Sequence, residues 1–238
     1  MDPFTICTYN THCFPWTDPA IKEIVGWIVA NCDIVALQEI WCRHAAWAAV
    51  FAAHGWTFLR PARENHIAAV FGSGLAVAWR SRDWQLGEAR LYPFLNYSGI
   101  DALVTKGWFR VELTQRRTQK TLRVINTHMQ ADYDIGGEYF RSLTEPIRMA
   151  QAWQLVEVEK RMPRVPTLIV GDMNTEECWF RDTVGWMRTT HAHTFPESDQ
   201  ALDHCTTWVG TACEFTGHTV HPLAWSDHYA VTWRIAFG

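Results

Sequence analysis

The 238 residues carry a formal net charge of −4, and 48% of them are hydrophobic against 19% charged. This balance favours a folded chain with a large core over intrinsic disorder. The acidic net charge argues against a broadly basic nucleic-acid surface, but not against a local basic groove. A chain of this length without a linker or repeat predicts a single domain over residues 1–238.

The start of the chain and its cysteines bear on location. Met1 to Pro3 lead directly into a strand-like segment, with no basic and apolar leader before it, and no apolar run is long enough to span a bilayer. The seven cysteines are odd in number, scattered and without a CxxC pair, which is typical of reduced, buried thiols. We therefore expect a cytoplasmic protein that can associate with a membrane surface; a mature secreted form with its leader removed is the alternative.

Strand and helix patterns alternate along the chain. Short apolar runs predict strands, and apolar residues three and four apart predict helices. The expected elements are, in chain order, a strand at 4–10, a helix from 21 to 28, a strand at 33–39, a helix at 43–55, a strand at 74–80, a hairpin at 107–128, a helix at 145–161 with Pro146 in its first turn, a strand from 166 into GDMN, a helix around 180–187 and a strand at 228–236. These elements predict a mixed α/β fold, and two sheets packed face to face with helices outside would fit.

Polar side chains stand at the ends of five of these strands. They are Asn10, Glu39, His128, the pair Asp172 and Asn174, and the pair Asp227 and His228. Each has an ordinary explanation by itself, such as a turn, a helix start or a structural histidine. Together they are expected to meet, because the active sites of layered α/β folds are built from loops at strand ends.

The residue types at these positions favour one kind of chemistry. Glu39, Asn10 and Asp227 offer hard oxygen ligands, which suit Mg²⁺, Mn²⁺ or Ca²⁺ rather than zinc. Two histidines beside carboxylates supply proton-transfer groups, and Asn174 can donate a hydrogen bond to a developing oxyanion. The combination predicts metal-assisted hydrolysis of a phosphate ester.

Five motifs in order give the chain a family likeness. The segments TYN (8–10), LQE (37–39), NTH (126–128), GDMN (171–174) and SDH (226–228) resemble those of the endonuclease/exonuclease/phosphatase superfamily, the DNase I-like fold, over nearly the whole chain. TKGW (105–108), NTHMQADY (126–133), IRMAQAWQLVEV (147–158) and SDHYAV (226–231) resemble neutral and bacterial sphingomyelinases of the C type. The resemblance implies a four-layer α-β-β-α sandwich, two packed mixed β-sheets flanked by helices, with the site at one rim.

The resemblance also implies a metal site. Glu39 would be the principal ligand of a divalent cation, with Asn10 beside it, and Asp227 would help to set the metal and histidine geometry. Mg²⁺ is the expected cofactor, and Mn²⁺ is the alternative.

Catalytic and substrate-binding roles follow from the same likeness. Asp172 would orient or activate the attacking water, and Asn174 would hold a phosphate oxygen. His228 would act as general base or bind phosphate, while His128 would contact the substrate and stabilise the transition state. Lys106 is either a turn residue or, by the resemblance, a phosphate contact.

Three further patterns are weighed against ordinary explanations. Asp203, in the sequence LDH, either orients an imidazole or belongs to an ordinary strand edge. A zinc site is disfavoured, because neither His12, Cys13, Cys42 and His44 nor His191 and His193 have the ligand spacing of zinc modules. The membrane-docking aromatic hairpin of secreted sphingomyelinases has no unmistakable equivalent, and residues 133–145 are either a surface loop in its place or a plain connection.

The substrate is the least constrained expectation. The basic clusters are small, and hairpin geometry places the largest, QRRTQK at 115–120, far from His128; the others are Arg60 with Arg63 and Arg80 with Arg82. The 14 Trp, 12 Phe and 6 Tyr can form an aromatic face for a choline headgroup or a membrane surface. We expect a choline phospholipid, sphingomyelin first, with nucleic acid as the alternative. A catalytically silent lipid- or protein-binding relative is the third hypothesis, but it should have lost a motif residue and none is missing. No obligate protein partner is indicated.

Overall fold

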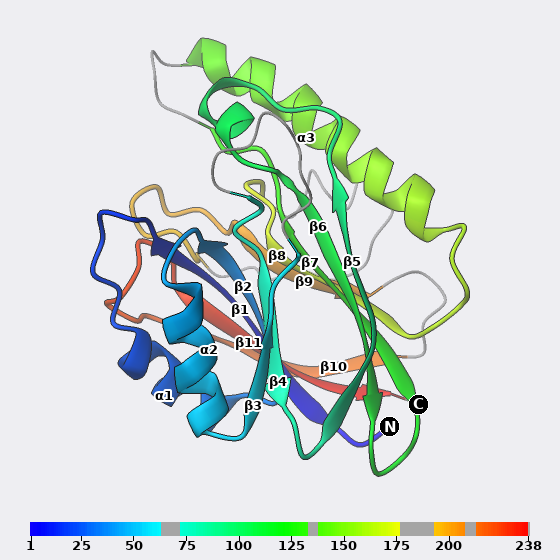
Figure 1. Cartoon of the computed structure of the whole chain (residues 1–238). Coiled ribbons are helices and arrows are strands. Elements are labelled where there is room, and N and C mark those ends of the chain that lie inside the picture. Colours follow the sequence, from blue (N-terminus) through cyan, green and yellow to red (C-terminus); the bar gives the residue numbers. More distant parts are fainter. Residues whose placement is uncertain (63–71, 133–137, 177–192, 208–212, 238) are drawn as a thin grey trace.

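Two β-sheets packed face to face form the centre of the computed structural model, which describes residues 1–62, 72–132, 138–176, 193–207 and 213–237 (Figure 1). The six-stranded sheet has the order β10 (Cys213–His221), β11 (Ala230–Phe237), β1 (Phe4–Cys13), β2 (Ile34–Ile40), β4 (Ala76–Arg80), β3 (Trp56–Leu59). The five-stranded sheet has the order β5 (Trp84–Pro93), β6 (Gly107–Gln115), β7 (Thr121–His128), β8 (Thr167–Asp172), β9 (Asp203–Thr207). Both sheets are mixed, since β1 with β2 and β7 with β8 are parallel pairs among antiparallel ones.

Helices cover the two outer faces. α1 (Ile21–Asn31) and α2 (His44–Ala53) lie on the six-stranded sheet, and α3 (Glu138–Glu159) lies on the five-stranded sheet (Figure 1). A short 3-10 helix, η1 (Gly99–Leu103), interrupts the connection from β5 to β6. The fold is therefore the predicted α-β-β-α sandwich. In the described ranges, no helix combines the length and apolar character that crossing a bilayer requires.

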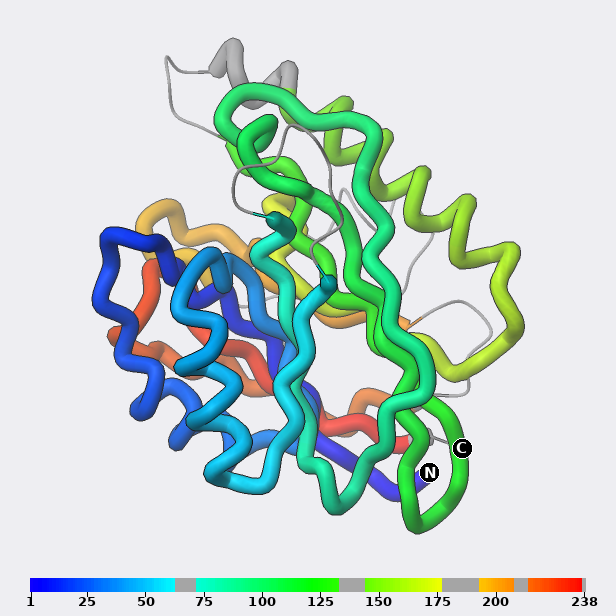
Figure 2. The backbone as a smooth tube through the Cα atoms, viewed as in Figure 1, coloured from blue at the N-terminus to red at the C-terminus, as the bar shows by residue number. Residues whose placement is uncertain are grey.

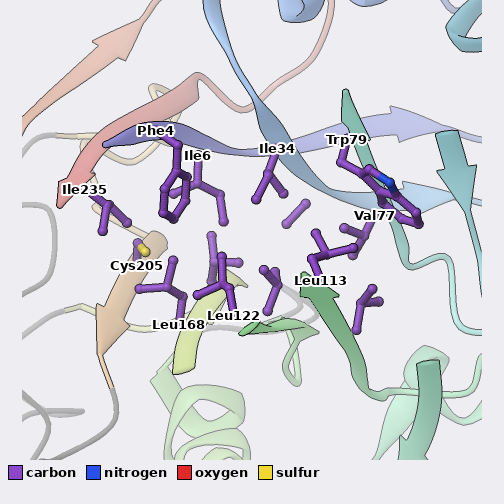
Figure 3. Packing of buried hydrophobic residues seen from close by; sticks show 14 of the residues in the cluster. Phe4, Ile6, Ile34, Val77, Trp79, Leu113, Leu122, Leu168, Cys205 and Ile235 are labelled. Atoms are coloured by element: carbon purple, nitrogen blue, oxygen red, sulfur yellow. The ribbon is translucent and has the colours of Figure 1, made fainter. Parts of the chain in front are cut away.

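Figure 3 shows how the facing sheets fill the space between them. Phe4, Ile6 and Ile34 of the six-stranded sheet point toward Leu122 and Leu168 of the other, and all five are buried. Alternate residues of the inner strands face the helices instead, as Cys7 and Tyr9 do. Strands buried on both faces need apolar side chains at nearly every position, which is why β1, β2 and β8 are recognisable as apolar runs.

A buried polar cluster joins the two sheets close to the rim. The Asn126 side chain donates to the Leu37 carbonyl oxygen over 2.8 Å, and its own oxygen accepts from Gln38 Nε2 over 2.7 Å. Asn126 belongs to β7 and its partners to β2. Because Glu39 follows Gln38 directly and His128 lies two residues after Asn126, these hydrogen bonds fix the position of one site residue relative to the other.

Some elements differ from the sequence prediction. α3 begins at Glu138 and holds Pro146 inside it, so Pro146 is not in its first turn as predicted; a proline within a helix removes one backbone hydrogen bond without preventing the helix. β3, β5, β9 and β10 were not predicted. Most residues of β5 are exposed, so that strand has no apolar run. The helix predicted around 180–187 lies outside the described residues.

The chain direction defines two rims of the sandwich. Both ends of the chain lie at the rim where β1 begins (Figure 2). The β6–β7 hairpin turn lies at the same rim as the chain ends. β7 begins after this turn, pairs in parallel with β8, and ends with it at the opposite rim. Strands β1, β2, β7 and β8 therefore direct their last residues to the opposite rim.

Candidate active site

The rim where β1, β2, β7 and β8 end gathers the predicted residues. Asn10, Glu39, His128 and Asp172 lie at the ends of these strands, while Asp203 begins β9 and His228 precedes β11. The contacts below show that all of them meet, with Asp227 and Asn174 beside them.

Asp172 is at the centre of the cluster. Its Oδ2 accepts a hydrogen bond from Asn10 Nδ2 over 3.0 Å, and it lies 3.6 Å from His128 Nε2 and 3.7 Å from His228 Nε2. Its Oδ1 accepts from the Asn174 backbone N–H over 2.9 Å. Burial alone would raise the pKa of this carboxyl, but the imidazoles of His228 and His128 outweigh burial and lower it. Asp172 is thus ionised between two imidazoles.

His228 is held by a second carboxylate. Its Nδ1 lies 2.8 Å from Asp203 Oδ2, so its Nε2 is the atom that faces Asp172. Burial lowers the pKa of His228, yet the Asp203 and Asp172 carboxylates more than offset burial and raise it to about 10. Burial raises the pKa of Asp203 to about 6 against the opposing effect of His228. The structure thus gives Asp203 the imidazole-orienting position, one of the two alternatives that the sequence left open.

His128 has the opposite environment. Burial, followed by the nearby Lys106 charge, lowers its pKa. Its Nε2 lies 3.9 Å from Glu39 Oε1. Lys106 itself is buried, donating to the Met129 carbonyl oxygen over 2.8 Å and lying 3.3 Å from Asp101 Oδ1. It therefore supports the segment after His128, and a direct phosphate contact by Lys106 stays a prediction.

Glu39 and Asp227 offer the oxygens for a cation. Glu39 Oε2 is buried and has no hydrogen-bond partner in the described part of the chain. Asp227 Oδ2 lies 2.9 Å from His12 Nδ1, and this bond, against the effect of burial, lowers the pKa of Asp227. Asn10 is partly engaged, because its Oδ1 accepts from the His12 backbone N–H over 3.1 Å. A buried carboxylate oxygen without a donor fits a hard divalent cation.

Backbone shape also marks this rim. Glu39 and Asn174 adopt left-handed conformations, with φ of 58° and 50°; asparagine tolerates this backbone well, whereas for glutamate it is uncommon. Gly171 has φ of 147°, and a Cβ there would collide with the Thr127 carbonyl oxygen. The glycine of GDMN is therefore required for β8 to pair closely with β7.

Asp172, Asp203 and His228 are also close enough together to hold a metal ion, with one ligand atom of each within 4.8 Å of the others. Asp203 already binds His228 Nδ1, and protonation of His228 removes its other nitrogen as a ligand. A cation held by Glu39, Asn10 and Asp227 stays a prediction.

An exposed apolar loop stands beside the site. Leu95 and Tyr97 precede η1, Ile100 and Leu103 belong to it, and the four are 81%, 46%, 54% and 47% exposed. Two hydrogen bonds tie this loop to the segment after His128, from the Ser98 N–H to Gln130 Oε1 and from the Ala131 N–H to Asp101 Oδ2, at 2.9 and 3.0 Å. We call residues 94–103 the rim loop.

Several sequence patterns lie apart from the site. The four residues considered for zinc, His12, Cys13, Cys42 and His44, do not share a site. The Cys13 and Cys42 sulfurs are 3.5 Å apart, but His44 Nε2 lies 2.9 Å from the Ile40 carbonyl oxygen and His12 faces Asp227. His193 lies by Asp199. His191, Arg63 and Cys178 are outside the described residues. Of residues 133–145, expected to be a surface loop or a plain connection, 133–137 are also outside them, and 138–145 are helical because α3 begins at Glu138. The QRRTQK turn is at the far rim, as predicted.

His12 is the residue that sequence reasoning misplaced. The sequence offers it only as a member of a disfavoured zinc set with Cys13, Cys42 and His44, and its spacing from Asn10 gives no sign of a contact with Asp227. The signal lies in the backbone: the pairing of β1 with β2 shifts register between Asn10 and Cys13, and a bulge of this kind redirects a side chain.

A sequence model described as the Endonuclease/Exonuclease/phosphatase family matches residues 7–228. The chain belongs to this family. Its members are phosphoester hydrolases that depend on a divalent metal. No match was found among curated proteins.

Solved structures of the same fold include proteins that act on different substrates. SmcL has 20% sequence identity and a TM-score of 0.77, with 98% of this chain and 99% of that chain covered. Sphingomyelinase C from Streptomyces griseocarneus has 17% identity and a TM-score of 0.69, with the same coverage. TDP2 from D. rerio, in complex with a single-strand DNA product, has 12% identity and a TM-score of 0.74, covering 99% of this chain and 100% of that chain. At these identities the likeness shows the fold alone.

Proposed function

We propose that this chain is a divalent-metal-dependent phosphodiesterase that hydrolyses a choline phospholipid, sphingomyelin first, by in-line attack of water. The observation that carries the hydrolase assignment is Asp172, ionised between His128 and His228 at 3.6 and 3.7 Å. A carboxylate, two imidazoles and a metal-binding carboxylate in one place are what phosphate-ester hydrolysis requires.

Each residue has a role in this proposal. Asp172 orients or activates the attacking water, and Asn174 holds a phosphate oxygen with a donor N–H. His228, protonated beside Asp203, binds the phosphate. His128 donates a hydrogen bond as charge develops on the transferred group.

Glu39 and Asp227, with Asn10 alongside, would hold the cation. When bound, Mg²⁺ or Mn²⁺ supplies Lewis-acid stabilisation of phosphate charge. The donor set fits this role, because Glu39 Oε2 is buried without a hydrogen-bond donor and both carboxylates are hard ligands.

The rim loop supports a lipid substrate over DNA. Four exposed apolar side chains next to a phosphodiesterase site suit the interface of a membrane or micelle. DNA binding instead needs cations near the site. The basic hairpin turn lies at the far rim, where Arg117 pairs with Asp2, and Arg60, which follows β3, is a basic residue at the site rim. A cytoplasmic protein that associates with a membrane surface is consistent with this proposal.

One experiment separates the two substrate classes. Phosphocholine release from sphingomyelin in mixed micelles is compared with nicking of plasmid DNA at equal protein and Mg²⁺. We expect phosphocholine release without nicking. Rapid nicking without phosphocholine would establish a nuclease, and inactivity on both together with RNA and inositol phosphates would favour a silent relative.

The metal assignment has its own test. Replacing Glu39 by Gln keeps the side-chain size but removes the charge, so kcat should fall by at least about 10²-fold, the scale of losing one well-placed electrostatic contribution. EDTA should abolish wild-type activity, and added Mg²⁺ or Mn²⁺ should restore it. Glu23→Gln, at an exposed position of α1, is the control. Full activity of Glu39→Gln would remove Glu39 from the site.

A further inference from the structure

Two cysteine thiols are in contact where β1 and β2 end. Cys13 is the last residue of β1, and Cys42 follows the last residue of β2 by two positions. Their sulfur atoms lie 3.5 Å apart, and the Trp41 N–H donates to the Cys13 carbonyl oxygen over 3.2 Å, which holds the two segments side by side. The sulfurs of a disulfide are about 2.05 Å apart, so closing the pair requires a movement of about 1.5 Å that two side chains share.

The two thiols differ in their access to solvent. Cys13 is fully buried, whereas Cys42 is partly exposed and donates to the Phe14 carbonyl oxygen over 3.2 Å. Burial, followed by the hydrogen bond to Cys42, raises the pKa of Cys13 to about 11, so Cys13 is a protonated thiol at neutral pH. An oxidant in solution therefore meets Cys42 first, and Cys13 is the neighbouring thiol that reacts next.

A second pair of thiols in the chain gives a comparison. Cys7 and Cys32 also interact through their side chains, but both are buried, with 0% and 1% exposure, in the cluster between the six-stranded sheet and its helices. A dissolved oxidant does not reach either of them without opening the core. Contact between thiols is thus common to both pairs, and the partial exposure of Cys42 is what distinguishes its pair.

We propose that Cys13 and Cys42 are a modification site, which hydrogen peroxide converts reversibly into a disulfide that ties the end of β1 to the end of β2. In the first step, the Cys42 sulfur attacks the O–O bond of the peroxide, which gives a sulfenic acid and one water. In the second step, the Cys13 sulfur attacks the Cys42 sulfur and the S–S bond forms. The hydroxyl group of the sulfenic acid leaves with the Cys13 proton as a second water, so two thiols are oxidised and one peroxide is reduced.

The disulfide acts on the rim that carries the candidate site. Asn10 lies three residues before Cys13 in the sequence. Glu39 likewise lies three residues before Cys42. The cross-link closes a loop of about 30 residues and stabilises the fold chiefly by restricting the unfolded chain, so the unfolding temperature should rise by about 5 °C or more. This inference concerns the response of the rim to oxidation and goes beyond the proposed function, because it holds whichever phosphodiester the site takes.

Peptide mapping tests the site directly. The full chain is reduced, desalted, treated with a limited amount of hydrogen peroxide, alkylated without reductant and digested. Mass spectrometry should detect a cross-linked peptide that joins Cys13 to Cys42, and dithiothreitol should return both thiols to alkylation. Hydrogen exchange in the peptides that contain residues 10–13 and 39–42 should be about tenfold slower or more in the oxidised protein than in the reduced one.

The variants separate this cross-link from other effects of peroxide. Cys42→Ser removes the partly exposed thiol and should lose both the cross-link and the rise in unfolding temperature. Cys13→Ala serves the same purpose if Cys42→Ser is less stable than the reduced wild type. Cys32→Ala removes one thiol of the buried pair, and as the matched control it should form the cross-link and gain stability like the wild type.

Two results would overturn the inference. One is a peroxide-treated wild type in which Cys13 is still alkylated, including the case in which Cys42 is oxidised further to a sulfinic acid. The other is a cross-link that forms without a rise in unfolding temperature, because the ends of β1 and β2 would then be held equally well without it. Neither result bears on the proposed function, which the comparison of micelles and plasmid tests with the reduced protein.

Discussion

The two imidazoles beside Asp172 differ in charge because their neighbours differ. His228 meets the Asp203 and Asp172 carboxylates and its pKa rises, whereas burial and the Lys106 charge lower the pKa of His128. A pair of like residues with pKa values pushed apart is a common sign of divided acid–base roles. Of the two roles that the sequence offers for His228, phosphate binding therefore fits its protonated state better than that of a base.

Both histidines should be needed for turnover. Replacing either His128 or His228 by Ala should lower kcat by roughly 10²- to 10⁴-fold, the range for a positioned proton-transfer or hydrogen-bonding group. The measurement is initial rate together with thermal unfolding, and His218→Ala on the exposed part of β10 is the control. If the unfolding temperature of a variant falls steeply along with its activity, while that of His218→Ala does not, the replaced histidine is structural instead.

The Asp203–His228 pair should make stability depend on pH. The pKa of His228 rises from the ordinary 6.5 to about 10 on folding, so the folded state binds a proton that the unfolded state releases. The stabilisation from this residue is complete below pH 6.5 and is lost as pH rises toward 10. Asp203→Asn should lower the pKa of His228 and flatten this decline.

The check is denaturant unfolding at several pH values between 6.5 and 10, with the His228 ring titrated by NMR. If the unfolding free energy of Asp203→Asn declines over this range as steeply as that of the wild type, the pair is not the origin of the pH dependence.

At the scale of elements, the predictions held where burial leaves a pattern. The strands 4–10, 33–39 and 166–172 have both faces buried, so an apolar run marks each and the polar residue after it marks the rim. β5 is mostly exposed and β9 opens with Asp203 and His204, so neither has such a run. The five motifs located the candidate site, but contacts between motifs, such as His12 with Asp227, depend on a bulge that spacing does not encode.

The Asn126 cluster is where element packing controls the site. Asn126→Ala would leave the Leu37 and Ala76 carbonyl oxygens and Gln38 Nε2 without this partner, and a buried polar group left unpaired costs about 1–3 kcal/mol. We expect a loss of at least about 2 kcal/mol in the free energy of unfolding. Activity should fall too, because Glu39 and His128 lose their common anchor.

Denaturant unfolding and initial rates test this, with Asn31→Ala on the exposed end of α1 as the control. An Asn126→Ala protein as stable and active as this control would show that sheet packing alone positions the two residues.

At the scale of the whole molecule, the two rims have different surfaces. The far rim carries the basic hairpin turn, where Arg116 donates to the Ser81 carbonyl oxygen and Arg117 pairs with Asp2. The site rim carries the rim loop, whose apolar side chains face solvent beside His128. Exposed Arg60 follows β3, which runs toward the site rim as β2 does, so basic residues occur at both rims. The exposed apolar side chains of the rim loop are therefore the feature that favours an approach to lipid with the site rim first.

The rim loop should matter for aggregated lipid and not for soluble substrate. Leu95→Ser with Ile100→Ser removes two of the exposed apolar side chains that would enter the interface. The rate on sphingomyelin vesicles should fall about tenfold or more, since the binding of an interfacial segment scales with the apolar area that it buries. The rate of hydrolysis of a soluble choline phosphodiester should stay within about twofold of the wild-type rate. The reason is that the rim loop contacts the segment after His128 through Ser98 and Asp101, and the variant retains both residues.

Leu86→Ser is the matched control, because Leu86 is 39% exposed on β5 and pairs with Leu113 near the far rim. It should leave both rates unchanged. Vesicle sedimentation measured in parallel separates binding from turnover. Equal losses of rate on vesicles and on the soluble substrate would show that the rim loop shapes the active site. An unchanged rate on vesicles would show that the protein binds lipid through another surface. Only a loss confined to vesicles, absent from Leu86→Ser, assigns the rim loop to the membrane, since that pattern requires a surface that acts before the phosphodiester reaches Asp172.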